Sequence, residues 1–381
     1  MQWQGAQEGY SKGRERSFHF GNREHHICGM ISHIGPQLAI ADGVALAHKL
    51  RKENKVSLAF TGDGGTSEGD FHEALNTAAV WELPVIFIIE NNGYGLSTPT
   101  SEQYRCKNLV DKAAGYGIEG VQIDGNNILT VYDTIKGVRD YCIKNQKPYL
   151  IECMTFRMRG HEEASGVKYV PKNLFEEWEK KDPIKNFESW LLRENLVTEA
   201  EVQAIRAEIK NHIEEELKEG FLSDPIIADT DPEIADVYAN SQSNPAWLID
   251  NSDEGPVHSS GTSSEKKFIN AISDALEQSL QKHSNLVLMG QDIAEYGGAF
   301  KVTEGFVEKF GKERIRNTPL CESAIVGATL GMSLEGYKSV MEMQFADFAT
   351  VGFNQIINNL AKIHYRWGQN ADVVIRMPTG G

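Results

Sequence analysis

The chain has 381 residues, of which 40% are hydrophobic and 9% aromatic, so it has room for two or three folded domains and is not a disordered polypeptide. A formal net charge of −16 disfavours broad binding to nucleic acid or to an anionic membrane surface. The five cysteines contain no CxxC pair, which favours a reduced, cytoplasmic protein, and we expect neither a membrane span of ~20 apolar residues nor a secretory segment.

The first part of the chain alternates between helix and strand patterns. Residues 36–50 are apolar at helical spacing behind a proline, and residues 84–92 form a nearly unbroken apolar run, as in a strand buried on both faces. Further strands are expected at 55–64, 121–127 and 148–157, and further helices at 70–83 and 128–146. This alternation predicts a doubly wound α/β domain with a parallel sheet over roughly residues 30–160.

The composition then changes twice. Charged helices with apolar stripes are expected over 173–196 and 198–220, where Thr198 and Glu201 have capping-box spacing. Residues 221–263 are rich in Asp, Pro, Ser and Asn and are interpreted as a linker. A second α/β pattern follows, with helices expected at 265–283, 323–336 and 348–366, and extended segments at 285–293, 314–319, 338–345 and 371–378.

Polar residues follow two neighbouring strands of the first domain. Asp63 comes just after one strand, and Asn91 and Asn92 come just after the next. Parallel sheets bind ligands beyond the carboxyl ends of their strands, and carboxylate, amide and carbonyl oxygens suit Mg²⁺ or Ca²⁺. The glycines around Asp63 and the following helix N-terminus suit a diphosphate. Either motif alone is more typical of a simple turn; their combination is more specific, and it is neither a P-loop nor a dinucleotide fingerprint.

The stretch "GDGGTSEGDFHEALNTAAVWELPVIFIIENNGYGLST" resembles the thiamine-diphosphate motif in the alpha chain of 2-oxoacid dehydrogenases. The segments "RIRNTPLCESAIVGATLGMSLEGYKSVMEMQFADF" and "FNQIINNLAKIHYRWG" resemble the beta chain of the same enzymes. The resemblance implies an alpha–beta fusion of the decarboxylating component, with four parts and with incomplete ends. These parts are a diphosphate- and Mg-binding domain (1–160), a helical extension (161–220), the linker (221–263) and a pyrimidine-binding domain (264–381).

The same resemblance assigns roles in the first half. Asp63, Asn92 and the carbonyl of Tyr94 would bind Mg²⁺, which holds thiamine diphosphate. Gly64 and Gly65 would contact the phosphates through their backbone. Ser32 and Ile34 would touch the cofactor rings. His161 would lie by the diphosphate and the reacting carbon. For Ile34, ordinary core packing is an equal alternative.

In the second half, Glu322 matches the activating glutamate of the family. A carboxyl group that hydrogen-bonds a pyrimidine ring nitrogen favours the imino form of that ring, whose exocyclic nitrogen then accepts the thiazolium proton. The alternative is a glutamate that only favours the first turn of a helix. Other pyrimidine-contacting positions would be Leu320, Gln344 and Phe348.

The implied reaction is oxidative decarboxylation of a 2-oxoacid with acyl transfer to a lipoyl-bearing acyltransferase. The stretches "TPLCE", "QFADF" and "HYRWG" lean towards branched-chain substrates over pyruvate or acetoin. In the family the cofactor lies between subunits, so we expect a homodimer and, for a chain incomplete at both ends, little activity alone. A transketolase-like thiamine enzyme and a non-catalytic scaffold are the alternatives.

Overall fold

The structure is a computed structural model that describes residues 1–381 except 30, 163, 165, 225, 240–264 and 380–381. Its first sheet contains four strands in the order β1-β2-β6-β5, and every neighbouring pair is parallel. The strands are β1 (Ser57–Gly62), β2 (Val85–Asn91), β5 (Glu119–Asp124) and β6 (Tyr149–Met154). The predicted parallel α/β architecture is therefore confirmed.

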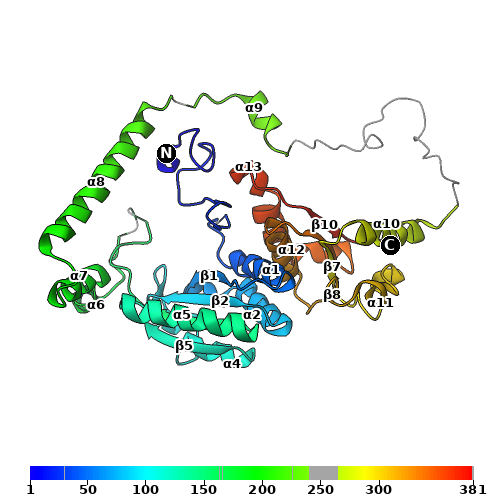
Figure 1. The fold of residues 1–381 in the computed structure, drawn as a ribbon, viewed down its shortest axis with the longest axis horizontal. Helices are drawn as coiled ribbons and strands as arrows, with labels where there is room; N and C mark the ends of the chain where they lie inside the picture. The colour runs from blue at the N-terminus through cyan, green and yellow to red at the C-terminus, as the bar shows by residue number, and fades with distance from the viewer. Residues whose placement is uncertain (30, 163, 165, 225, 240–264, 380–381) are drawn as a thin grey trace.

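Helices cover both faces of this sheet (Figure 1). Along β2, Val85, Phe87 and Ile89 belong to the core cluster that contains residues of α1 (Pro36–Leu50) and α2 (Gly69–Trp81). The alternate residues of β2 pack instead against α5 (Ile128–Asn145). Successive side chains of a strand point to opposite faces, so an apolar run is what a strand buried on both faces requires.

The first half also contains several short elements. The two-stranded ribbon of β3 (Tyr94–Gly95) and β4 (Thr98–Pro99) is antiparallel. The others are η1 (Gln2–Gln4), η2 (Gly64–Ser67), α3 (Thr100–Gln103), η3 (Leu109–Asp111) and α4 (Lys112–Gly115).

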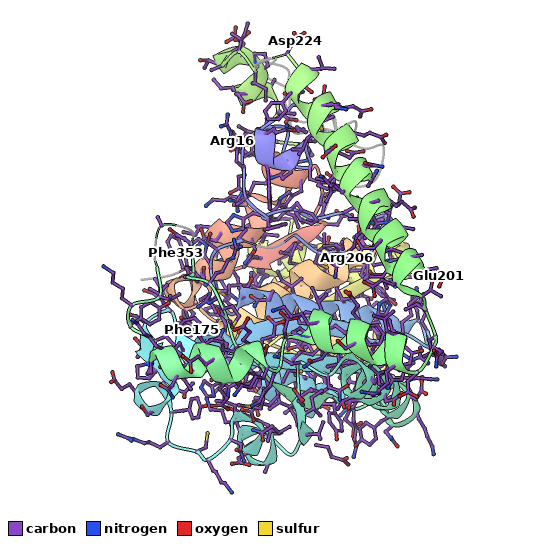
Figure 2. All side chains as sticks on the ribbon, turned by 90° about the vertical axis from the view of Figure 1, so that its left-hand side faces the viewer. Arg16, Phe175, Glu201, Arg206, Asp224 and Phe353 are labelled. Carbon is purple, nitrogen blue, oxygen red and sulfur yellow. The ribbon has the colours of Figure 1, made fainter. Side chains whose placement is uncertain are left out.

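A helical extension follows the first sheet: α6 (Lys172–Glu179), α7 (Pro183–Arg193) and α8 (Glu199–Leu222). The capping box at the start of α8 is present, because the Thr198 hydroxyl accepts from the Glu201 N–H and the Glu201 carboxylate accepts from the Thr198 N–H at 2.7 Å. Figure 2 shows α8 along one edge of the molecule, from Glu201 towards Asp224. Within the expected linker, residues Thr230–Ala235 form the short helix α9. No helix of the described residues is long and apolar enough to cross a bilayer.

The second sheet is also parallel, with the order β10-β9-β7-β8. Its core packs against α10 and α11. The elements are α10 (Phe268–Lys282), β7 (Leu286–Gly290), η5 (Ala299–Lys301), α11 (Phe306–Phe310), β8 (Ile315–Asn317), α12 (Glu322–Leu334), β9 (Lys338–Glu342) and β10 (Val373–Arg376).

The prediction of a single helix over 348–366 is wrong. The segment is divided into a 3₁₀ turn η6 (Ala346–Thr350), a π-helical turn η7 (Gln355–Leu360) and α13 (Ile363–Trp367). The buried Gln355 amide donates to the carbonyl of Pro36 at 2.8 Å, a contact with the first half of the chain. This long-range hydrogen bond lies within the π turn, and helical periodicity carries no information about it.

Helices α1 and α12 cross in close contact and join the two halves into one core (Figure 1). A Cβ atom on Gly43 would lie 2.0 Å from the carbonyl oxygen of Ala328, and one on Gly331 would lie 2.0 Å from that of Ile40. Only glycine permits two backbones to approach this closely. The crossing therefore depends on these two residues.

We expect Gly43→Ala to lower the free energy of unfolding by about 1–3 kcal/mol, because the new methyl group meets backbone that cannot rotate away. Urea denaturation monitored by circular dichroism measures this change. The control is Gly137→Ala in α5, where a Cβ meets nothing within 4 Å and where alanine raises helix stability by about 0.5–1 kcal/mol. Equal effects of the two substitutions would refute the close crossing.

One carboxyl group of α1 is buried without a hydrogen-bond partner. Asp42 has no exposed surface, and neither of its oxygens has a hydrogen-bond partner. Burial raises the pKa of Asp42 well above its usual range. The folded state therefore holds this proton more tightly than the unfolded chain, and stability falls as the pH rises from the unfolded value of about 3.9 towards the folded pKa.

We expect Asp42→Asn to remove this pH-dependent loss, so that the variant gains stability over the natural chain as the pH rises from 4 to 8. Urea denaturation across this range measures the difference. The control is Asp140→Asn in α5, where the aspartate side chain is 57% exposed beside Arg139. If the free energy of unfolding changed with pH in the same way in Asp42→Asn and in the natural chain, Asp42 would not be a buried neutral acid.

Candidate functional site

Asp63 lies at the carboxyl end of the first sheet. Strands β1 and β2 run in parallel register, with Gly62 opposite Glu90, so the residues after each strand meet at the same edge. Asp63 is 1% exposed, and its Oδ1 accepts from the Gly64 N–H at 2.7 Å. Its Oδ2 is buried and accepts no hydrogen bond. A buried carboxylate oxygen without a partner is a position that a cation would fill.

The turn after β2 faces this carboxylate. Asn92 Oδ1 accepts from the Tyr94 N–H at 3.2 Å, and the positive φ of 86° at Gly93 allows the turn to fold back. Burial raises the pKa of Asp63, and the nearby backbone N–H groups of Gly64 and of the Asn92–Tyr94 turn oppose that rise; of these groups, the Gly64 N–H alone lies at hydrogen-bond geometry to the carboxylate. The structure thus brings all three predicted metal ligands to one edge of the sheet.

A hydrogen-bond network beneath the turn was not predicted from the sequence. Asn91 donates through Nδ2 to the Glu152 carboxylate at 2.7 Å and accepts from the Gly93 N–H at 3.1 Å. Glu152 is fully buried and also accepts from Gln122 Nε2 and the Val110 N–H, both at 3.0 Å. This network fixes the turn from below. A glutamate inside an apolar strand was its one sequence signal.

The chemistry of these groups fits a hard divalent cation. One carboxylate, one amide and one main-chain carbonyl are all oxygen ligands, which Mg²⁺ prefers together with phosphate oxygens and water. In the part of the chain that the structure describes, no three His, Cys, Asp or Glu side chains gather as a metal cluster. A cation at Asp63 would therefore take the mixed oxygen set.

The predicted phosphate-contacting glycines directly follow Asp63, and Ile34 lies against the second of them. Gly64 and Gly65 begin the turn η2, and a Cβ on Gly65 would lie 2.7 Å from Ile34 Cγ2. Ile34 is 52% exposed, so it is not part of the core. Ser32 is exposed, and its hydroxyl lies 3.0 Å from Nε2 of His19.

His161 lies on the exposed segment after β6. The Arg157 guanidinium donates to its Nδ1 at 2.9 Å, so the neutral imidazole carries its proton on Nε2. Further along this segment, the ring of Tyr169 lies 5.9 Å from that of Tyr94. Tyr169 thus lies beside Tyr94 of the predicted metal corner, and His161 is exposed.

Glu322 is the first residue of α12, and Gln291, which is 5% exposed, donates to its carboxylate at 3.0 Å. The next two residues connect this helix start to α2. The Ser323 hydroxyl bonds Asp70, and the Ala324 N–H donates to Glu73 at 2.9 Å. Helix α12 thus begins against the helix that follows the Asp63 turn. Sequence reasoning missed Gln291, because its pairing with Glu322 joins positions far apart in the chain.

The remaining predicted residues lie beyond β8 and β9 in the second sheet. Leu320 is 81% exposed. Gln344 donates to Asp292 at 3.3 Å. Phe348 packs edge-to-face on Phe345, with ring centroids 5.9 Å apart. These residues follow the carboxyl ends of parallel strands, where open sheets bind ligands.

Two parts of the chain match known protein families. Residues 1–221 match the family described as dehydrogenase E1 component, and the chain belongs to that family. Residues 264–381 match the family described as transketolase, pyrimidine binding domain. The resemblance to thiamine-diphosphate-dependent 2-oxoacid dehydrogenases, stated from the sequence, is confirmed.

The first half of the chain is similar to alpha subunits of two dehydrogenases and of an oxidoreductase. The alpha 2 subunit of mitochondrial 2-oxoisovalerate dehydrogenase from Arabidopsis thaliana is 37% identical over 217 residues, which cover 56% of this chain and 46% of the relative. The alpha subunit of acetoin:2,6-dichlorophenolindophenol oxidoreductase from Bacillus subtilis (strain 168) is 40% identical over 191 residues, with 50% and 57% covered. The pyruvate dehydrogenase E1 alpha subunit from Staphylococcus aureus (strain Mu50) is 42% identical over 188 residues, with 48% and 51% covered. The chain spans about half the length of the curated relatives it matches.

Proposed function

We propose that this chain binds thiamine diphosphate with Mg²⁺ and serves in the oxidative decarboxylation of a 2-oxoacid. The observation that carries the proposal is the buried Asp63 oxygen without a partner, opposite the Asn92–Tyr94 turn. Family membership supports the same cofactor. A chain with regions that match both families supports an alpha–beta fusion.

The first half would hold the diphosphate end of the cofactor. Asp63, Asn92 and the Tyr94 carbonyl would bind Mg²⁺, and the backbone of Gly64 and Gly65 would face the phosphates. His161 presents an Nε2–H donor, which suits a phosphate oxygen or a carboxylate of the substrate. Bound thiamine diphosphate supplies a carbon nucleophile and an electron sink for decarboxylation.

The second half would act on the pyrimidine end. Glu322 would hold a proton at its carboxyl oxygen and share it with a ring nitrogen, while Gln291 keeps the carboxyl group oriented. Leu320 and Phe348 would exclude water from the ring, and Gln344 would hydrogen-bond its edge. In this arrangement each half contributes groups that the other lacks.

Substrate, partner and assembly are the finer parts of the proposal. We favour a branched-chain 2-oxoacid on the "TPLCE", "QFADF" and "HYRWG" stretches, with pyruvate and acetoin as the alternatives; the relatives include all three classes of enzyme. The acyl group would pass to a lipoyl-bearing acyltransferase. A homodimer, in which cofactor sites lie between copies, would be the working form.

Isothermal titration calorimetry of the full chain with thiamine diphosphate, with and without Mg²⁺, tests the cofactor proposal. We expect binding that requires Mg²⁺; absence of Mg²⁺-dependent binding would refute it and favour a non-catalytic scaffold. Reductive acylation of a lipoyl domain then separates a 2-oxoacid dehydrogenase from a transketolase-like enzyme. A panel of branched-chain 2-oxoacids, pyruvate and acetoin decides the substrate.

A further inference from the structure

Three side chains, one of which is the predicted ring-contacting Ser32, form a hydrogen-bonded series. The hydroxyl of Ser32 lies 3.0 Å from Nε2 of His19, and Nδ1 of the same ring lies 3.3 Å from Oε1 of Glu15. The side chains of His19 and Glu15 are 22% and 19% exposed, so both are largely shielded, whereas Ser32 is exposed. The exposed end of the series is therefore the serine.

The order of groups fixes the direction of each hydrogen bond. A carboxylate only accepts, so Glu15 selects the imidazole tautomer with its proton on Nδ1. In the neutral ring Nε2 then has a lone pair, which accepts the Ser32 hydroxyl proton. The free side of the Ser32 oxygen consequently presents lone pairs outward, and it suits a ligand N–H donor rather than an acceptor.

The second half of the chain holds this series in place. The Arg366 guanidinium in α13 pairs with the same Glu15 oxygen, and the Trp367 indole N–H donates to the carbonyl of His19 at 3.1 Å. The Trp367 ring also lies against Gly29, where a Cβ would be 2.2 Å from a ring atom. Helix α13 thus sets both the charge next to His19 and the position of its backbone.

A second anchor holds the same segment one residue before Glu15. Arg14 pairs with Glu233 at 3.1 Å and with Asp236 at 2.8 Å, and its guanidinium carbon lies 4.0 Å from the centroid of the Tyr365 ring. Tyr365 in turn donates its hydroxyl to Glu233 at 2.9 Å. The segment is therefore fixed from α9 and α13 together.

We infer that His19 is a positioning residue that orients the Ser32 hydroxyl as a hydrogen-bond acceptor for an amino group of the bound cofactor. The inference rests on the proposed function for the identity of the ligand. It adds a role for α13, which acts on the first-half site through Glu15 and His19. The orientation of the hydroxyl itself follows from the three side chains alone.

A double-mutant cycle measured by calorimetry with thiamine diphosphate and Mg²⁺ tests the inference. We expect His19→Ala and Ser32→Ala each to weaken binding about five- to tenfold, the loss of one hydrogen bond, and the double variant to lose no more than either. His19→Gln, whose amide oxygen can accept the same proton, should retain most of the affinity. Additive losses, or no rescue by glutamine, would overturn the role.

The matched control is His72→Gln, because the His72 ring also bonds a hydroxyl, that of Tyr116 at the end of α4. It should leave affinity unchanged. Thermal melting of every variant separates positioning from folding: a purely structural role would lower the melting temperature while leaving the affinity of the folded fraction intact, and that result would contradict positioning.

Nitrogen-15 NMR of histidine-labelled full-length chain tests the orientation without cofactor. The His19 signals, identified by their loss in His19→Gln, should show a neutral ring protonated on Nδ1, and Ser32→Ala should shift the Nε2 signal. A ring protonated on Nε2 would overturn the inference. If the natural chain binds no thiamine diphosphate, the proposed function fails, and this spectrum still decides how Ser32 is oriented.

Discussion

Asp63→Asn is expected to weaken Mg²⁺-dependent binding of thiamine diphosphate by about a hundredfold or more, because it neutralises the one charged ligand among the predicted three. The same change should leave the free protein as stable or more stable by about 1 kcal/mol. The reason is that the buried carboxylate has an oxygen without a partner, and burial raises its pKa. Calorimetry and urea denaturation measure the two effects.

The control for this variant is Asp124→Asn at the end of β5, a carboxylate in the corresponding position on the edge strand of the same sheet. Its carboxylate accepts from the Asn126 N–H at 2.9 Å, so it serves its own turn. Cofactor binding should be unaffected. If Asp63→Asn bound the cofactor as tightly as the natural chain, the metal assignment would be wrong.

Proton competition gives the Asp63 site a pH dependence. The pKa of Asp63 is raised by burial, and Mg²⁺ binds the ionised carboxylate. Metal binding should therefore release a proton, and the affinity for Mg²⁺ should increase as the pH rises through the folded pKa. This dependence should disappear in Asp63→Asn, in calorimetric titrations repeated in buffers of different ionisation enthalpy.

Glu322→Gln is expected to slow hydrogen exchange at the thiazolium carbon of bound thiamine diphosphate by about 10²–10⁴-fold, the range for loss of a general acid–base group. Binding of the cofactor should be nearly unchanged, because the amide keeps the size of the carboxyl group and a hydrogen-bonding oxygen for Gln291. Proton NMR after transfer into D₂O measures the exchange rate, and calorimetry measures binding.

Glu335→Gln is the control at the opposite end of the same helix. Glu335 pairs with Arg51, so its loss should lower stability slightly and leave exchange unaltered. Normal exchange in Glu322→Gln would remove Glu322 from the chemistry and return it to a role in helix stability. Loss of cofactor binding instead would assign Glu322 to binding rather than to proton transfer.

The parts of the fold that the sequence predicted are those set by local pattern. The apolar run at 84–92 identified β2, and helical spacing behind Pro36 gave the bounds of α1. The placement of Asp63 beside Asn92 followed from one rule about adjacent parallel strands. Each of these inferences needed only a local pattern or one rule about neighbouring strands.

The parts that escaped prediction depend on contacts between distant segments. The π turn at 355–360 contains a glutamine that bonds Pro36, and the Glu322 carboxyl group is held by Gln291. The series from Glu15 to Ser32 likewise depends on α13 for its charge balance. No periodicity or motif encodes such pairs, since their partners are brought together by tertiary packing alone.

The glycine crossing of α1 and α12 has a consequence for synthesis of the chain. Helix α1 leaves the ribosome before α12, which begins at Glu322 and therefore follows on the order of tens of seconds later. Until then the part of α1 that α12 buries has no partner, although α2 and β1 already cover the rest of the helix, and the nascent chain carries an unprotected apolar patch. We therefore expect this chain to depend on chaperones during translation. The dependence should be greater than for a chain in which the helices that pack on the first sheet follow it directly in the sequence.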